Sequence, residues 1–113
     1  DWRSQGDTLQ ALRAHAFDDP LAHPGQADLT AHVDFEPLAE LAPAHSYTTQ
    51  GAFLERLGIA ARAARLAANL TGAALESHLA AHHRLTHPAE MGSLFKVLAL
   101  TSTDAPLPPG FGP

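Results

Sequence analysis

The sequence predicts an α/β fold that is rich in helices and contains two or three strands. Leu94–Leu100 (LFKVLAL) is a nearly continuous apolar run with a β-branched centre, which is typical of a strand buried on both faces. Between Gly51 and Arg84, apolar residues recur at helical spacing. A strand buried on both faces needs neighbours on both edges, and this chain offers few. We therefore expect part of an α/β sheet domain rather than the whole of one.

Composition excludes several classes of protein. The chain has 113 residues, of which 45% are apolar and 17% charged, as suits one small globular domain. Its net charge of −5 argues against a general nucleic-acid binder, and the absence of cysteine excludes disulfides and thiolate metal sites. No apolar run is long enough for a membrane span, and no signal peptide is visible. We expect a soluble, cytoplasmic protein, and the frequent Ala, Arg and Pro favour a bacterial source.

The first elements follow from local patterns. Thr8–Arg13 alternates loosely between apolar and polar residues and predicts a short strand. Phe17–Asp28 contains prolines, a glycine and aspartates and predicts a loop. A helix should follow over Asp34–Ala42. Either Thr30 or Asp34 can be its N-cap, because a side-chain oxygen there accepts hydrogen bonds from free first-turn N–H groups.

Helices dominate the predicted second half. One covers Gly51–Asn69, with its arginines turned outward and with Gly58 as a break between two pieces. Another begins after the cap Thr71 and ends near Arg84. Before them, His45–Gln50 is expected to be extended and to end in a threonine cap, either the first or the second of its two threonines.

Histidines on the second of these helices suggest a metal site. His78 and His82 are one helical turn apart, and His83 follows directly. No third ligand has a fitting spacing, and there is no His-Glu-x-x-His motif. A helical surface rich in histidine is therefore expected, and no metal site.

Four stretches occur in one order along the chain: GDTLQALRAH, DPLAHPGQADLTAHVDF, TTQGAFLERLGI and LTHPAEMGSLFKVLAL. Together they resemble the C-terminal portion of the MidA-like class I S-adenosylmethionine-dependent methyltransferases. This family is related to mitochondrial arginine methyltransferases that are assembly factors for respiratory complex I. The resemblance covers the chain from Gly6 to about Leu100.

The resemblance implies a Rossmann-like sheet of seven strands with helices on both faces. It places Thr8–Arg13 just beyond the fifth strand and Asp34–Ala42 as the helix that follows. Leu94–Leu100 becomes a late, antiparallel strand. Asp1–Trp2 would stand where the family has Asp-Tyr-Gly, with Arg3 in place of the glycine.

The resemblance also implies S-adenosylmethionine as the cofactor. The family binds it through a glycine-rich turn after the first strand and an acidic residue at the end of the second. This chain contains no G-x-G-x-G, so its cofactor-binding residues stay unassigned. Residues 1–100 would then be the C-terminal, substrate-side part of a methyltransferase domain, inactive alone. Residues 101–113 would be a Pro/Gly-rich tail with no packing pattern.

Polar residues beyond the early strand form the candidate site, because ligands of open α/β sheets bind beyond the carboxyl ends of the strands. The mitochondrial relatives suggest an arginine of a protein substrate as the methyl acceptor. A carboxylate can hold a guanidinium through two hydrogen bonds and take up or orient its proton. The expected catalytic residues are Asp28, Asp34 and His32. The expected substrate-binding residues are Arg13, His15, Thr30 and Gln50.

Each of these residues has a structural alternative. The aspartates and Thr30 also suit helix caps and turns, the histidines suit hydrogen bonds to backbone near a strand end, and Gln50 suits a solvent position. A second function, from a different class, is a non-catalytic helical interaction module or assembly factor. In that case the polar loop and the alanine-rich helices would bind a partner protein.

Overall fold

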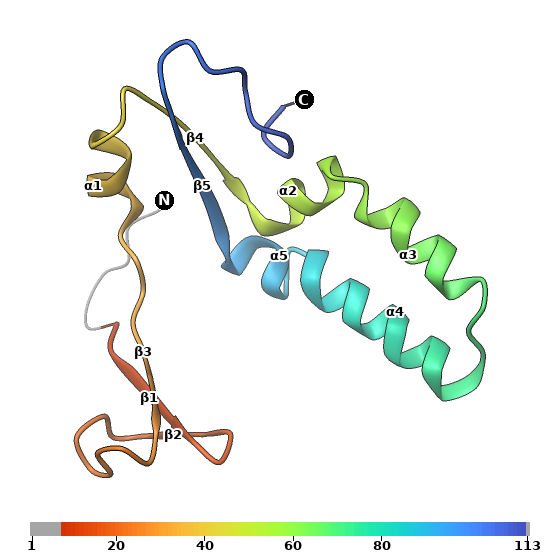
Figure 1. Cartoon of the computed structure of the whole chain (residues 1–113). Coiled ribbons are helices and arrows are strands. Elements are labelled where there is room, and N and C mark those ends of the chain that lie inside the picture. Colours follow the sequence, from red (N-terminus) through yellow and green to blue (C-terminus); the bar gives the residue numbers. More distant parts are fainter. Residues whose placement is uncertain (1–7, 113) are drawn as a thin grey trace. The chain divides into compact units, whose positions relative to one another are not determined.

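The computed structural model describes residues 8–112 and confirms a mixed α/β architecture (Figure 1). The chain divides into two compact units, Asp1–Leu41 and Ala42–Pro113. Its described strands form one three-stranded and one two-stranded sheet. The motif expected at Asp1–Trp2 lies outside the described residues. Across residues 8–112, no helix has the length and apolar character needed to cross a membrane.

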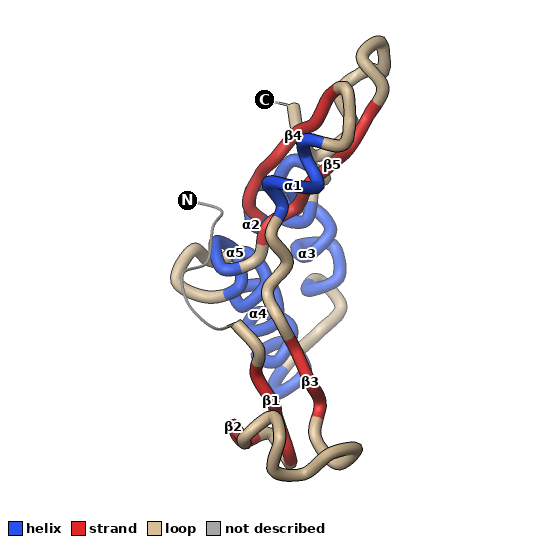
Figure 2. Tube along the Cα trace, turned by 90° about the vertical axis from the view of Figure 1, so that its left-hand side faces the viewer, coloured by secondary structure: helices blue, strands red, loops and turns tan. Residues whose placement is uncertain are grey.

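An antiparallel sheet forms the first unit and confirms the strand predicted within Thr8–Arg13. Strand β1 (Gln10–Arg13) lies between β2 (Ala16–Asp18) and β3 (Asp28–Thr30), and Figure 2 shows β1 and β3 side by side. The loop predicted over Phe17–Asp28 is therefore wrong at both ends. Each end is held in a strand by its pairing with β1, which no local pattern reveals.

A two-residue turn joins β1 to β2. Ala14 and His15 have φ angles of 49° and 64°, so both lie in the left-handed region. This corresponds to a type I′ turn, whose twist matches that of a hairpin but whose usual residues are Asn and Gly. Because neither Ala nor His signals such a turn, the sequence pattern does not predict β2.

Helix α1 (Phe35–Glu40) begins at one of the two predicted caps. Asp34 Oδ1 accepts a hydrogen bond from the N–H two residues later at 3.1 Å, whereas Thr30 ends β3. The helix is shorter than the predicted Asp34–Ala42. Its extension is disfavoured because the last predicted residue precedes Pro43, and a residue before proline avoids the helical conformation.

The two-stranded sheet of the second unit joins β4 (Ala44–Thr49) to β5 (Lys96–Thr101) in antiparallel register. It confirms a strand over most of Leu94–Leu100, although the first residue of that run ends helix α5 (Met91–Leu94). The predicted burial on both faces is wrong: no residue of β5 is fully buried, and Leu100 is 47% exposed, as is Phe95 just before the strand. Within the described residues each strand has only the other as its partner, so much apolar surface stays open.

Besides α5, three described helices lie between these strands in the chain: α2 (Gln50–Arg56), α3 (Ile59–Ala67) and α4 (Gly72–Thr86). Gly58, with φ of 86°, separates α2 from α3 and confirms the predicted break. Thr49 caps α2 by accepting a hydrogen bond from the Ala52 N–H, so the second of the two predicted threonines is the cap. Figure 1 shows α3 and α4 side by side and antiparallel.

Two buried glycines let three backbone segments pack closely at the base of these helices. A Cβ added at Gly51 would lie 2.6 Å from the carbonyl oxygen of Thr86. A Cβ added at Gly92 would overlap the backbone of Thr86 and His87. The start of α2, the start of α5 and the end of α4 therefore pack backbone against backbone.

The C-terminal tail also packs, contrary to expectation. Gly110 is buried against the ring of Phe53, and Phe111 contacts the same ring edge-on with centroids 5.4 Å apart. The Gly-Phe-Gly stretch thus covers part of α2. The contact joins residues far apart in the chain, so no local pattern predicts it.

Candidate functional site

A charged cluster closes the hairpin of the first unit. Asp18 Oδ2 accepts hydrogen bonds from Arg13 Nε at 3.0 Å and from His23 Nδ1 at 2.8 Å. Its other oxygen accepts one from the Asp19 N–H at 3.0 Å. The Arg13 guanidinium first, and then His23, hold the pKa of the Asp18 carboxyl below its usual range. The ionised carboxylate therefore ties the loop after β2 back to β1.

Arg13, a predicted substrate-binding residue, is thereby engaged by Asp18. Its side chain is 46% exposed, so the guanidinium still faces solvent on one side. Sequence reasoning missed both Asp18 and His23 as functional candidates. The only signal was an acid and a histidine five residues apart in a Pro/Gly-rich segment, and their meeting depends on how that segment turns.

Strand register divides the predicted site residues between the two faces of the sheet. Asp28 pairs with Leu12 and Thr30 with Gln10, so these four side chains lie on one face. Arg13 follows Leu12 and lies on the opposite face, because successive side chains alternate along a strand. The structure thus brings Asp28 and Thr30 together and separates them from Arg13.

The segment after β3 carries the other two predicted catalytic residues. The His32 N–H donates to Thr8 Oγ1 at 3.3 Å, which ties this segment to the chain just before β1. Asp34 caps α1 and is exposed. Four exposed polar residues therefore follow one another at two-residue spacing: Asp28, Thr30, His32 and Asp34.

The remaining predicted residues, His15 and Gln50, lie in different units. His15 is exposed at the tip of the β1–β2 turn. Gln50 belongs to the second unit, where its Nε2 donates to the carbonyl oxygen of Leu85 at 2.9 Å. Its backbone N–H donates to the Phe95 carbonyl oxygen, also at 2.9 Å. These bonds fasten the start of α2 to α4 and to the segment before β5.

Two histidines of α4 make contacts with neighbouring residues, whereas the buried Nε2 of His82 has no hydrogen-bond partner among the described residues. In the part of the chain that the structure describes, no group of three His, Asp or Glu side chains could hold a metal. The Nε2 atom of His78 donates to the carbonyl oxygen of Ala63 at 2.9 Å, which links α4 to α3. His83 stacks on His87 with ring centroids 4.3 Å apart.

Comparison with known proteins places this geometry in a family. Residues 2–53 match the model of a family described as "Putative S-adenosyl-L-methionine-dependent methyltransferase". The mitochondrial protein arginine methyltransferase NDUFAF7 homologue of Drosophila melanogaster is 38% identical over 100 residues, or 83% of this chain. The Xenopus laevis NDUFAF7 is 34% identical over 99 residues, again 83% of this chain. A solved Burkholderia thailandensis structure bound to S-adenosyl-homocysteine covers 93% of this chain with a TM-score of 0.71 and 32% identity.

The chain belongs to this methyltransferase family. The family resemblance is thus confirmed, and so is S-adenosylmethionine as the cofactor of the family. The chain spans 23% of the length of each of these two curated relatives and 28% of the solved chain. The buried glycines at positions 51, 92 and 110 pack against protein atoms, so the structure identifies none of them as a cofactor loop.

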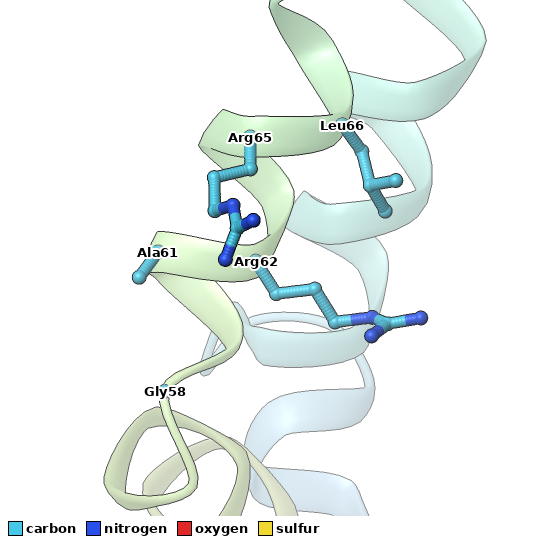
Figure 3. A pocket seen from close by; sticks show the side chains of 5 residues that line it. All are labelled: Gly58, Ala61, Arg62, Arg65 and Leu66. Atoms are coloured by element: carbon cyan, nitrogen blue, oxygen red, sulfur yellow. The ribbon is translucent and has the colours of Figure 1, made fainter.

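This methyltransferase-family chain has a second notable surface, an open groove on α3 (Figure 3). The groove has a volume of about 530 Å³, and its lining residues are Gly58, Ala61, Arg62, Arg65 and Leu66. Figure 3 shows the two arginine side chains extending from α3, with Gly58 at one end of the groove and Leu66 at the other. The outward position of these arginines confirms the prediction, but sequence reasoning missed the groove itself.

Proposed function

We propose that the protein containing this chain transfers a methyl group from S-adenosylmethionine to an arginine side chain of a protein substrate. The observation that carries the proposal is the 38% identity over 100 residues to a protein arginine methyltransferase. It is supported by the solved relative bound to S-adenosyl-homocysteine, which is the form of the cofactor after the methyl group has left.

The acceptor side of the site is the exposed segment from Asp28 to Asp34. S-adenosylmethionine supplies an electrophilic methyl group when bound. A guanidinium nitrogen of the acceptor forms the new N–C bond, the S–C bond breaks, and a proton must leave that nitrogen. One of the two aspartates holds the guanidinium through paired hydrogen bonds and receives the proton, and His32 is a second group able to hold it.

The predicted substrate-binding residues divide into two kinds under this proposal. Thr30 shares a sheet face with Asp28, and His15 is exposed at a turn, so both are available to a substrate. Arg13 and Gln50 are positioning residues, because their hydrogen bonds hold the β1–β2 hairpin and the start of α2.

The same proposal assigns residues 1–100 to the substrate-side part of the methyltransferase domain and residues 101–113 to a tail. The partner is a protein substrate. The place of action is the cytoplasm of a bacterium, or the mitochondrion in a eukaryote, since the curated relatives are named mitochondrial.

One observation favours the alternative of a non-catalytic interaction module. Between the four polar residues of the site segment, Leu29 is 60% exposed and Val33 63% exposed. Apolar side chains at such positions suit a surface that a partner protein covers. An experiment must therefore separate methyl transfer from binding.

The test uses the natural full-length protein and an extract of cells that lack it. Mass spectrometry of arginine-containing peptides should detect new methyl groups that depend on added S-adenosylmethionine. The double variant Asp28→Asn with Asp34→Asn should lower transfer by roughly a hundredfold or more, the usual effect of losing acid–base catalysis. Asp104→Asn, in an exposed turn after β5, is the matched control and should transfer at the wild-type rate.

Partner binding by the wild-type protein without methyl transfer would establish the interaction module instead. If the double variant transfers methyl groups at the wild-type rate, the protein is a methyltransferase but these aspartates are not part of its catalytic site.

A further inference from the structure

The groove on α3 continues into an apolar depression at the junction with α2. That depression has a volume of about 300 Å³, and its lining residues are Leu54, Leu57, Gly58, Ile59 and Arg62. Gly58 and Arg62 line both hollows, so the two form one surface, here named the α2–α3 groove. The left-handed conformation of Gly58 creates the bend between the helices at which the groove lies.

Two positive charges border the groove, and neither has a counterion among the described residues. Arg62 and Arg65 are both exposed and stand three residues apart, so they lie on the same side of α3. Helix α3 carries no acidic residue. Within residues 8–112, neither guanidinium makes an ion pair or a side-chain hydrogen bond, whereas Arg56 on α2 donates to Thr48 Oγ1.

Helix stability accounts for only part of this arrangement. Arg65 lies in the last turn of α3, where a cation favours the helix dipole, but Arg62 lies in the middle of the helix. Ala63 faces α4, because its carbonyl oxygen accepts the hydrogen bond from His78 and the residue is half-buried. Arg65 lies on roughly the opposite side of α3 from Ala63 and Arg62 lies to one side of it, and both arginines are exposed.

Apolar side chains beside these charges define what would fit. Leu57 is 50% exposed and Leu66 is 49% exposed, one toward each end of the groove. An inorganic anion would use the guanidinium groups but leave the leucines open to water. Nucleic acid is disfavoured as the ligand, because the net charge of −5 on the chain repels its phosphates. A peptide segment with carboxylates next to apolar side chains satisfies both features, and arginines are frequent anchors of protein interfaces.

We propose that the α2–α3 groove binds a partner protein through an acidic segment that also carries apolar side chains. The proposed binding of a partner at this groove is independent of the proposed methyl transfer. It lies wholly in the second unit, and its lining residues are not among the proposed acceptor-side residues.

To test this proposal, a phage library that displays random dodecapeptides is selected for binding to the natural full-length protein. The selected peptides should be enriched in Asp and Glu flanked by Leu, Ile or Phe. A synthetic peptide of the enriched sequence is then measured by fluorescence anisotropy. Its affinity should fall at least tenfold for Arg62→Gln with Arg65→Gln, and equally when Gln replaces its acidic residues.

Arg84→Gln is the matched control, because Arg84 is an exposed arginine of α4 that does not line the groove. It should leave the affinity unchanged. Arg65 and Arg84 each lie in the last turn of a helix, so both variants should lose only a small helix-dipole contribution and should melt at similar temperatures, close to that of the wild type. Selection without acidic enrichment, or an affinity unchanged in the Arg62/Arg65 variant, overturns the proposal. Tighter binding of a single-stranded oligonucleotide through the same arginines also overturns it, since the surface would then bind polyanions.

Discussion

Arg13 and Asp18 form an ion pair diagonally across the β1–β2 hairpin, with Nε and Oδ2 3.0 Å apart. Their backbones are not direct partners: Arg13 pairs with Ala16, and Asp18 with Ala11. The same carboxylate oxygen binds His23. One acidic side chain thus holds two strands and the loop that follows them.

This cluster predicts how stability depends on pH. The pKa of Asp18 lies below its usual value of 3.8 in the folded protein, chiefly because of Arg13. The unfolded chain therefore binds a proton more readily, so the stabilisation is present above about pH 4 and is lost as pH falls through the lowered folded pKa. Urea unfolding of wild type and Asp18→Asn should differ at neutral pH, and the difference should shrink in acid. A difference that persists undiminished to about pH 2 contradicts this assignment.

The left-handed turn predicts a stabilising substitution. A non-glycine residue in this region costs about 1 kcal/mol, and Ala14 and His15 are both there. His15→Gly should therefore raise the free energy of unfolding by roughly 0.5–1 kcal/mol, measured by urea denaturation. Ala31→Gly, in an exposed segment without such a φ angle, should give no gain. If His15→Gly stabilises the fold but lowers methyl transfer, His15 has the substrate-binding role predicted for it.

The close backbone packing of the start of α5 against the end of α4 predicts a large loss of stability when Gly92 is substituted. Gly92→Ala places a methyl group into the backbone of Thr86 and His87, so overpacking should cost about 3 kcal/mol or more. Gly25→Ala is the control: Gly25 has a positive φ, which Gly92 does not, but a Cβ at Gly25 meets nothing within 4 Å. It should cost only about 1 kcal/mol. Similar melting temperatures for the two variants would show that α5 can move away from α4.

Substitutions at Asp34 can distinguish its role as the cap of α1 from its proposed role in methyl transfer. As the cap of α1 it should contribute about 1 kcal/mol, so Asp34→Asn should cost less than that, because asparagine is also a good cap. Methyl transfer by the full-length protein should nevertheless fall by roughly a hundredfold if the carboxylate receives the acceptor proton. Asp34→Ala should lose both the cap and the activity. Activity that follows stability in both variants would leave Asp34 a cap alone.

Features set by a few neighbouring residues were predictable from the sequence. Asp34 and Thr49 are caps because each accepts a hydrogen bond from an N–H two or three residues later. Gly58 breaks the long helix because glycine adopts a positive φ without strain. Such interactions are complete within one turn of chain, so the pattern of residue types is sufficient to reveal them.

Features that depend on distant residues were not predictable. Phe95 lies in an apolar run but is exposed, since burial requires neighbours that a pattern cannot supply. Phe111 packs on Phe53, although the two residues are far apart in the sequence. Arg13 lies on the sheet face opposite Asp28, and this follows from the strand register. The candidate site was therefore predicted as a set of residue types, but its division between faces required the structure.

The β4–β5 pairing has a consequence for how the second unit folds and varies. Thr49 and Lys96 are partners in the ladder, yet the whole segment of α2, α3, α4 and α5 lies between them. The entropy of closing a loop grows only with the logarithm of its length, so lengthening or shortening the α3–α4 hairpin should change the stability of the ladder little. Helices form from local contacts, whereas the β4–β5 ladder joins segments that are distant in sequence, so we expect it to form later than the helices during folding. Variants with a longer or shorter α3–α4 hairpin should therefore keep the register of the two strands at its base.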